Sequence, residues 1–351
     1  VVYVSAFASA SAIVFAVFLH RRRRASRSSR PWAAVSTGHP DEPRSARWLA
    51  SHWTPNRSSA PHAFRSSAAP TGLRPLEVKN WLEIEPHQIF TSQMKLKRNL
   101  ILSEDTANRF YASNAPVDDE VLEAEREVLE MLVNHLEQHF PDKYTVVHSH
   151  LHAKKLPTEV TERITGQVFR VADYAACPLK LCSLLVQEDF VLLSPAGPDG
   201  SPSYYVAACA TFSFMEIGLR GEKSEMKLGN SVAGIHTPVP GFNEQSGIGP
   251  KVAKYFEQLQ SSNPQYRTNW LLVSEQGLNP MRYDLTNADR EGMTLPTLTK
   301  AAEPEPQEYN LRVELQSVRR LPRTRHILFT IHCYSDPLPC LSVLPKAAAV
   351  L

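Results

Sequence analysis

The strongest constraint on the fold comes from the carboxyl-terminal part of the chain, where strand-like runs follow one another without helices between them. TNWLLVS begins at Thr268, NLRVELQS at Asn310 and RHILFTIHCY at Arg325. The segment VRRLPRT, which joins the last two runs, is too short for a parallel crossover, so these runs are expected to pair antiparallel. A run of strands with the helices placed elsewhere predicts an α+β fold and argues against a doubly wound parallel sheet.

Two stretches have the apolar spacing of amphipathic helices. In VDDEVLEAEREVLEMLVNHLEQHF, residues 117–140, apolar residues recur every four positions. Asp118 or Asp119 is expected to cap this helix, and Pro141 to end it. GPKVAKYFEQLQ, residues 249–260, is the second such stretch. Further helices are expected between Pro86 and Asn99 and in LKLCSLLVQED, and further strands in GQVFRVA, FVLLSP and YYVAACATFSF.

The chain is expected to have four parts. Residues 1–24 are an apolar segment with an arginine run, and residues 25–71 read as a disordered linker rich in Ser, Pro, Ala and Arg. Residues 72–340 are expected to form the folded domain, and residues 341–351 an irregular tail.

The first segment suggests a membrane anchor. Residues 1–19 carry no charge and are followed closely by Arg21 to Arg24. An apolar stretch of about 20 residues spans a bilayer, and arginines at its downstream end hold that end in the cytoplasm. We therefore expect an anchored protein with its domain facing the cytosol. A cleaved organelle-targeting peptide is the second explanation, because the region that follows is rich in Arg and Ser and free of acids. An artefact of the gene prediction is the third.

Charge and cysteine content exclude two common classes of protein. The formal net charge is +2, and it comes from the arginine run, since the remainder is mildly acidic. A nucleic-acid interface across the domain is therefore not expected. The five cysteines contain no CxxC pair, so a zinc knuckle is not expected either, and free thiols in a reducing compartment are the simplest interpretation.

The segment SVAGIHTPVPGF presents a single histidine, His236, between glycines and prolines that restrict the backbone. A rigidly held imidazole is what an axial haem ligand requires, because the iron must meet one ring nitrogen at a fixed angle. The competing interpretation is a histidine hydrogen-bonded within a turn.

Two strand segments place polar residues on one face. In YRTNW, Arg267 and Asn269 alternate with Thr268 and Trp270, and an arginine on an inner face would be placed to pair with a haem propionate. The competing interpretation is a structural ion pair.

In LRVELQSVRRLPRT, three polar residues, Arg312, Glu314 and Gln316, share one strand face. If that face points into a pocket, Glu314 is suited to hold a cationic amine and Arg312 to polarise bound oxygen. If it points to water, these are ordinary surface residues.

Six segments, in this order, resemble the haem-dependent oxidative N-demethylase alpha-subunit family: GLRPLEVKNWLEIEP, the acidic helix ending in HFP, LLVQEDFVLL, MKLGNSVAGIHTPVPG, YRTNW and LRVELQSVRRLPRTRHILFTI. The resemblance implies a haem b-binding, PAS-like α+β fold with flanking helices. It also implies oxidation of a small secondary amine such as dimethylamine, with O₂ and electrons from a separate reductase. On that basis His236, Arg267 and Asn269 would bind the cofactor, with His236 on the iron, and Glu314 and Arg312 would be catalytic. A non-catalytic haem-based gas or redox sensor is the alternative, because one fold hosts several functions.

The chain departs from the family pattern at three places. Leu315 stands where the family usually has Arg, and His332 and Cys333 stand where it has Arg-Thr. The family also continues for several dozen residues beyond the ILFTI strand, so either a truncated gene prediction or an absence of closing helices is expected.

Overall fold

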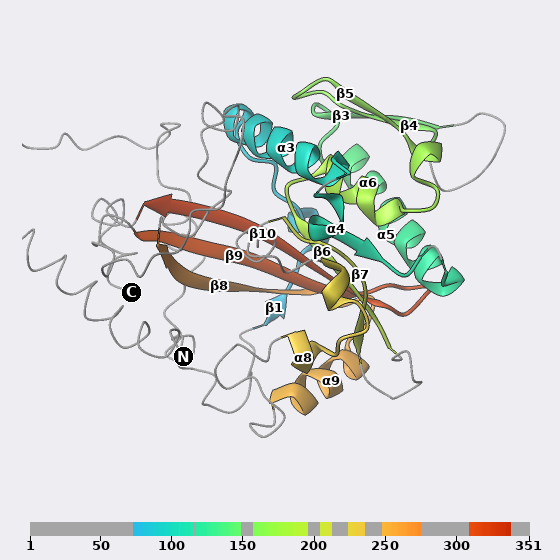
Figure 1. Cartoon of the computed structure of the whole chain (residues 1–351), viewed down its shortest axis with the longest axis vertical. Coiled ribbons are helices and arrows are strands. Elements are labelled where there is room, and N and C mark those ends of the chain that lie inside the picture. Colours follow the sequence, from blue (N-terminus) through green and yellow to red (C-terminus); the bar gives the residue numbers. More distant parts are fainter. Residues whose placement is uncertain are drawn as a thin grey trace, which may run out of the picture.

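A computed structural model describes residues 73–104, 106–115, 117–148, 157–195, 204–212, 224–235, 248–274 and 309–337 (Figure 1). These residues form the α+β architecture expected from the sequence, with one large antiparallel sheet between two groups of helices and a small second sheet. The parts predicted at residues 1–24, 25–71 and 341–351 lie outside the described ranges. Within those ranges, no helix combines the length and the apolar character needed to cross a membrane.

The large sheet has seven strands in the order β1-β8-β9-β10-β6-β7-β2, and each described pair of neighbours is antiparallel. The predicted antiparallel pairing of the last two strands is confirmed. The strands are β1 (Arg74–Pro75), β8 (Gln265–Ser274), β9 (Tyr309–Arg320), β10 (Ile327–Pro337), β6 (Asp189–Ser194), β7 (Tyr205–Ala210) and β2 (Tyr111–Ser113).

Four helices lie over one face of this sheet, which we call the helix face (Figure 1). They are α3 (His87–Leu102), α4 (Ala107–Phe110), α5 (Asp119–His139) and α6 (Pro178–Leu185). Their apolar side chains form a core with Phe190 and Leu192 of β6 and Leu328 of β10. The helix predicted for LKLCSLLVQED is shorter than expected, because β6 already begins at Asp189.

The opposite face, which we call the open face, carries a second core under α8 (Val232–Ile235) and α9 (Ile248–Gln258). Val252, Tyr255, Phe256 and Leu259 pack there, as the helical spacing of that segment predicts. Arg320 of β9 secures the end of α9, since its guanidinium donates to the Leu259 carbonyl at 2.8 Å and to that of Phe256.

The predicted cap of the long helix is confirmed. Asp118 accepts hydrogen bonds from the backbone N–H groups of Glu120 and Val121, and acids occupy the first turn of α5. One turn further on, Glu125 is fully buried and accepts the N–H of Leu179 at 2.9 Å, so that it satisfies a donor at the start of α6. Short 3₁₀ turns, η2 (Val78–Asn80), η3 (Val171–Tyr174) and η4 (Ser224–Lys227), connect other elements.

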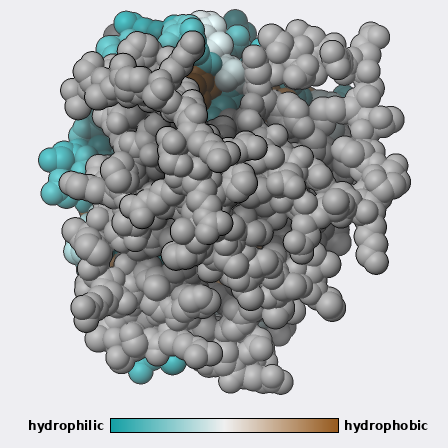
Figure 2. Space-filling model, turned by 90° about the vertical axis from the view of Figure 1, so that its left-hand side faces the viewer, coloured by the Kyte–Doolittle hydropathy of each residue, from teal (hydrophilic) through white to brown (hydrophobic). Residues whose placement is uncertain are grey.

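The small sheet consists of β3 (Tyr144–Val147), β4 (Glu159–Glu162) and β5 (Gln167–Arg170) and lies beyond the helices (Figure 1). Arg98 of α3 joins it to the domain through a buried ion pair with Glu162, with 3.2 Å between Nη2 and Oε2. The described residues that are visible at the surface in Figure 2 are mostly hydrophilic, as expected for a surface in water.

Candidate functional site

A buried group of polar side chains lies on the open face, centred on strand β9. We call Arg267, Arg312, Glu314, Gln316 and Cys333 the Glu314 cluster. The alternation predicted from the sequence places Arg312, Glu314 and Gln316 on one face, and all three are more than nine-tenths buried. The interpretation of these residues as an ordinary solvent-exposed strand face is therefore wrong.

The register of the neighbouring strands places Arg267 and Cys333 in the same cluster. Arg267 of β8 lies directly opposite Gln316, and Cys333 of β10 lies directly opposite Glu314. Directly opposed residues of antiparallel strands share a face. Asn269 is also at a position opposite Glu314, on the β8 side, but its side chain is outside the described part of the structure.

Hydrogen bonds link the cluster from one end to the other. Arg267 Nε donates to Gln316 Oε1 at 2.6 Å, and Gln316 Nε2 donates to Glu314 Oε2 at 2.8 Å. From the other side, Arg312 Nε donates to Glu314 Oε1 at 3.1 Å, and Arg312 Nη2 donates to Cys333 Sγ at 3.1 Å. Each carboxylate oxygen of Glu314 therefore accepts one hydrogen bond within the cluster.

The two arginines of the cluster have different electrostatic surroundings. Burial lowers the pKa of Arg312, but Cys333, Glu314 and Asp189 together outweigh burial, so that its pKa lies above the ordinary value. Burial also lowers the pKa of Arg267, and there the opposing effect comes from Glu314, which is already paired with Arg312. Arg267 is thus a partly buried guanidinium whose charge is incompletely balanced by the described residues around it.

His236 lies outside the described residues, but the elements that border its segment are described. Helix α8 ends at Ile235, and α9 begins at Ile248. Val232 of α8 and Val252 of α9 both pack in the open-face core. The chain therefore leaves and re-enters the described structure on the same face of the sheet as the Glu314 cluster.

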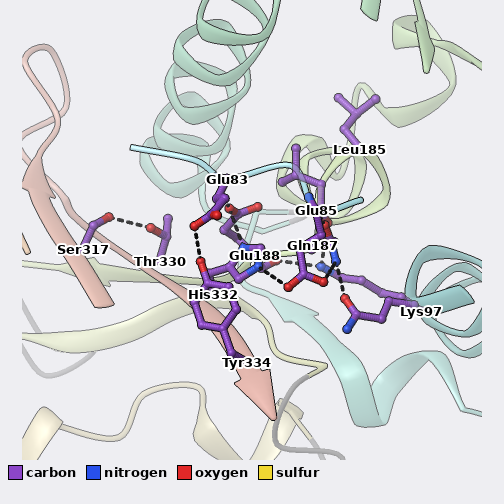
Figure 3. Close-up of polar contacts among 12 residues, drawn as sticks. Glu83, Glu85, Lys97, Leu185, Gln187, Glu188, Ser317, Thr330, His332 and Tyr334 are labelled. Carbon is purple, nitrogen blue, oxygen red and sulfur yellow. Dashed lines mark hydrogen bonds and ion pairs between the residues drawn. The ribbon is translucent and has the colours of Figure 1, made fainter. Parts of the chain in front are cut away.

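A second buried polar group lies on the helix face of the same strands, and we call it the His332 cluster (Figure 3). His332 Nδ1 lies 3.0 Å from Glu188 Oε1, and His332 Nε2 lies 3.7 Å from Glu85 Oε1. Gln187 accepts the backbone N–H of Glu85 and donates to its carboxylate. Tyr334 donates to Glu83. The cluster joins β10 to the residues before α3 and to the turn before β6.

Lys97 of α3 borders this cluster. Its Nζ donates to the carbonyls of Val186 and Glu188 at 2.9 and 2.6 Å. Burial lowers its pKa to about 8, although Asp189 and Glu188 oppose that effect.

The three residues that depart from the family pattern, Leu315, His332 and Cys333, are neighbours in the structure. Leu315 lies directly opposite His332 in the β9–β10 ladder, and Cys333 lies directly opposite Glu314. Leu315 and His332 are on the helix face, whereas Cys333 contacts Arg312 on the open face. The changes at these positions therefore affect both buried polar clusters.

Sequence reasoning missed the roles of Gln316, Cys333, Glu85 and Glu188. The alternation in LRVELQS places Gln316 on the correct face beside Glu314, but nothing local identifies Arg267 as its other partner, because Arg267 comes from another strand. Within the described ranges, no group of three or more His, Cys, Asp or Glu side chains is arranged to hold a metal ion. The four described cysteines are free, as expected, and Cys340 lies outside these ranges.

The fold and the cluster define an α+β domain with a buried, charged polar site on one face of an antiparallel sheet. A family model described as haem-dependent oxidative N-demethylase, alpha subunit-like, matches residues 72–351. Since this match covers most of the sequence, the chain belongs to that family, and the family suggested by the six sequence segments is confirmed.

Proposed function

We propose that this protein is a haem-dependent oxidoreductase that removes a methyl group from a small secondary amine such as dimethylamine. Family membership supports the reaction class. The observation that carries the site assignment is the Glu314 cluster, which places a buried carboxylate and two guanidinium groups on the face from which the His236 segment leaves the described structure. In the overall reaction, dimethylamine, O₂, two electrons and two protons give methylamine, formaldehyde and water.

The described residues fit a haem with its acidic side chains. A propionate would complete the charge balance of Arg267, whose guanidinium is partly buried and whose carboxylate neighbour Glu314 is already paired. His236 is proposed to bind the iron, and Arg267 and Asn269 are proposed to help hold the group. Haem b, when bound, would supply the redox chemistry at iron.

Glu314 is proposed to hold the substrate cation. Within the cluster, its two oxygens accept hydrogen bonds from Arg312 and Gln316. An ammonium N–H would be a further donor to this carboxylate, since a carboxylate oxygen can accept more than one hydrogen bond. The carboxylate would balance the substrate charge and can take its proton at an Oε atom. Arg312 stays charged and would draw electron density toward its own side of the site.

The electrons are proposed to come from a separate reductase, because the sequence has no recognisable nicotinamide, flavin or iron–sulfur motif. The test is reconstitution of the full chain with haemin, followed by titration of the ferric protein with dimethylamine while the Soret band is recorded. We expect an amine-dependent shift that is weakened in Glu314→Gln, and formaldehyde formation when a reductase is present. Tight gas binding without any response to amines would instead favour a haem-based sensor.

A further inference from the structure

Gln316 is the link between the two charged ends of the Glu314 cluster. It is only 6% exposed and bridges Arg267 of the neighbouring strand and Glu314 two residues away on its own strand. A guanidinium only donates hydrogen bonds, and a carboxylate only accepts them. These neighbours therefore fix the orientation of the amide, with its oxygen toward Arg267 and its nitrogen toward Glu314.

A neutral amide suits this position better than any ionisable group. Its N–H supplies Glu314 with a second donor but adds no charge, so the carboxylate is held from both sides without a second cation next to the substrate position. A glutamate of the same length would place a carboxylate oxygen against Glu314 Oε2, where Gln316 Nε2 now lies at 2.8 Å. Two carboxylates that close cannot both stay ionised, and they would share a proton.

We propose that Gln316 is a positioning residue that keeps the Glu314 carboxylate oriented for the substrate, and that couples the position of this carboxylate to the binding of an anionic group by Arg267. The substrate part of this inference rests on the proposed function. The Gln316–Glu314 contact itself stands on the hydrogen bonds within the cluster. Gln316 acts through Glu314 and Arg267 and needs no contact of its own with the reacting groups.

The first experiment measures the free energy of unfolding of the full chain in urea, without haem, between about pH 5 and about pH 8. The variants are Gln316→Glu, the apolar Gln316→Met, and Gln88→Glu as a matched exposed control. In Gln316→Glu the folded protein retains a shared proton that the unfolded chain has released, so its stability relative to the parent should fall as the pH rises. The folding equilibrium should change by up to about tenfold per pH unit.

Gln316→Met and Gln88→Glu should follow the pH profile of the parent. The double variant Glu314→Gln with Gln316→Glu exchanges amide and carboxylate, restores one donor–acceptor pair and should remove the additional pH dependence. If Gln316→Glu does not fold, recovery of folding in the exchanged variant supports the proposal in its place. A Gln316→Glu profile parallel to that of Gln88→Glu would overturn it, as would an exchanged variant that fails to recover.

The second experiment separates this proposal from the proposed function. Dimethylamine is titrated into the haemin-loaded parent and Gln316→Met, with the Soret band as the readout. We expect about a tenfold weaker amine response in Gln316→Met, because Glu314 loses one of the donors that orient it. An unchanged amine response in Gln316→Met would overturn the positioning role. If the parent ignores amines while Gln316→Glu shows the expected pH dependence of stability, the proposed substrate is overturned and the link between Gln316 and Glu314 is supported.

Discussion

At the scale of single residues, Arg267 provides a direct test of where an anionic cofactor group binds. Its guanidinium is partly buried, and the carboxylate beside it is already paired with Arg312. Arg267→Leu should weaken haemin binding about tenfold or more, because one charge-assisted contact to a propionate is lost. Arg267→Lys should weaken haemin binding less, since lysine keeps the positive charge but lacks the planar guanidinium that can donate two parallel hydrogen bonds to a carboxylate. The exposed Arg170→Leu is the control, and equal haemin affinity in all variants would contradict the assignment.

Glu125 should make stability depend on pH in the acidic range. Burial raises its pKa from 4.5 to about 6, against the hydrogen bonds from Ser113 and Leu179. The folded state therefore retains this proton in a range where the unfolded state has released it. The contribution to stability is fully present below pH 4.5 and is lost as the pH rises to about 6. The loss is about 2 kcal/mol.

Urea unfolding at several pH values checks this prediction. Glu125→Gln should remove this loss of stability with rising pH, because an amide does not titrate. The exposed Glu104→Gln should leave the loss unchanged. A Glu125→Gln profile that runs parallel to that of the parent would show that Glu125 titrates normally.

Residue-level prediction from the sequence worked where a strict period applied. The two-residue period of LRVELQS correctly grouped Arg312, Glu314 and Gln316. It did not predict that they would be buried, nor that Arg267 would lie opposite Gln316, since strand order and register depend on contacts distant in sequence. His332 could not be linked to Glu85 and Glu188 for the same reason.

At the scale of elements, helix α5 holds the β9–β10 turn through one carboxylate. Glu127 accepts hydrogen bonds from the backbone N–H of Arg323 at 2.7 Å and of Thr324 at 2.9 Å, and from the Thr324 hydroxyl at 2.8 Å. Glu127→Ala should lower the free energy of unfolding by about 3 kcal/mol, because three partly buried donors lose their common acceptor. Glu123→Ala removes a more exposed partner of Arg323 and should cost at most about 1 kcal/mol.

Equilibrium unfolding in urea measures both changes, and similar losses in the two variants would contradict a special role for Glu127.

The same helix shows why some elements were predictable. Long amphipathic stretches such as α5 and α9 carry enough periodic residues to define a helix, whereas β1 to β4 have two to four residues each and little apolar alternation. The small sheet was therefore largely missed.

At the scale of the whole molecule, the β9–β10 hairpin separates two buried polar clusters. Its open-face residues belong to the Glu314 cluster and its helix-face residues to the His332 cluster. Cys333 and His332 are consecutive but lie on opposite faces, so a substitution at Cys333 is placed to disturb the Glu314 cluster and one at His332 the His332 cluster. The substrate and cofactor sites are thus proposed on one face of a hairpin whose other face makes buried polar contacts through His332.

The location of the whole protein remains a prediction from residues 1–24. The uncharged segment followed by Arg21 to Arg24 is expected to anchor the domain to a membrane with the domain in the cytosol. Carbonate extraction of the expressed full chain should leave it in the membrane pellet, and a variant without residues 1–24 should move to the supernatant. Protease added to sealed vesicles should reach the domain only if it faces outward from them. Release of the full chain by carbonate, together with a shortened mature protein, would instead identify residues 1–24 as part of a cleaved targeting peptide.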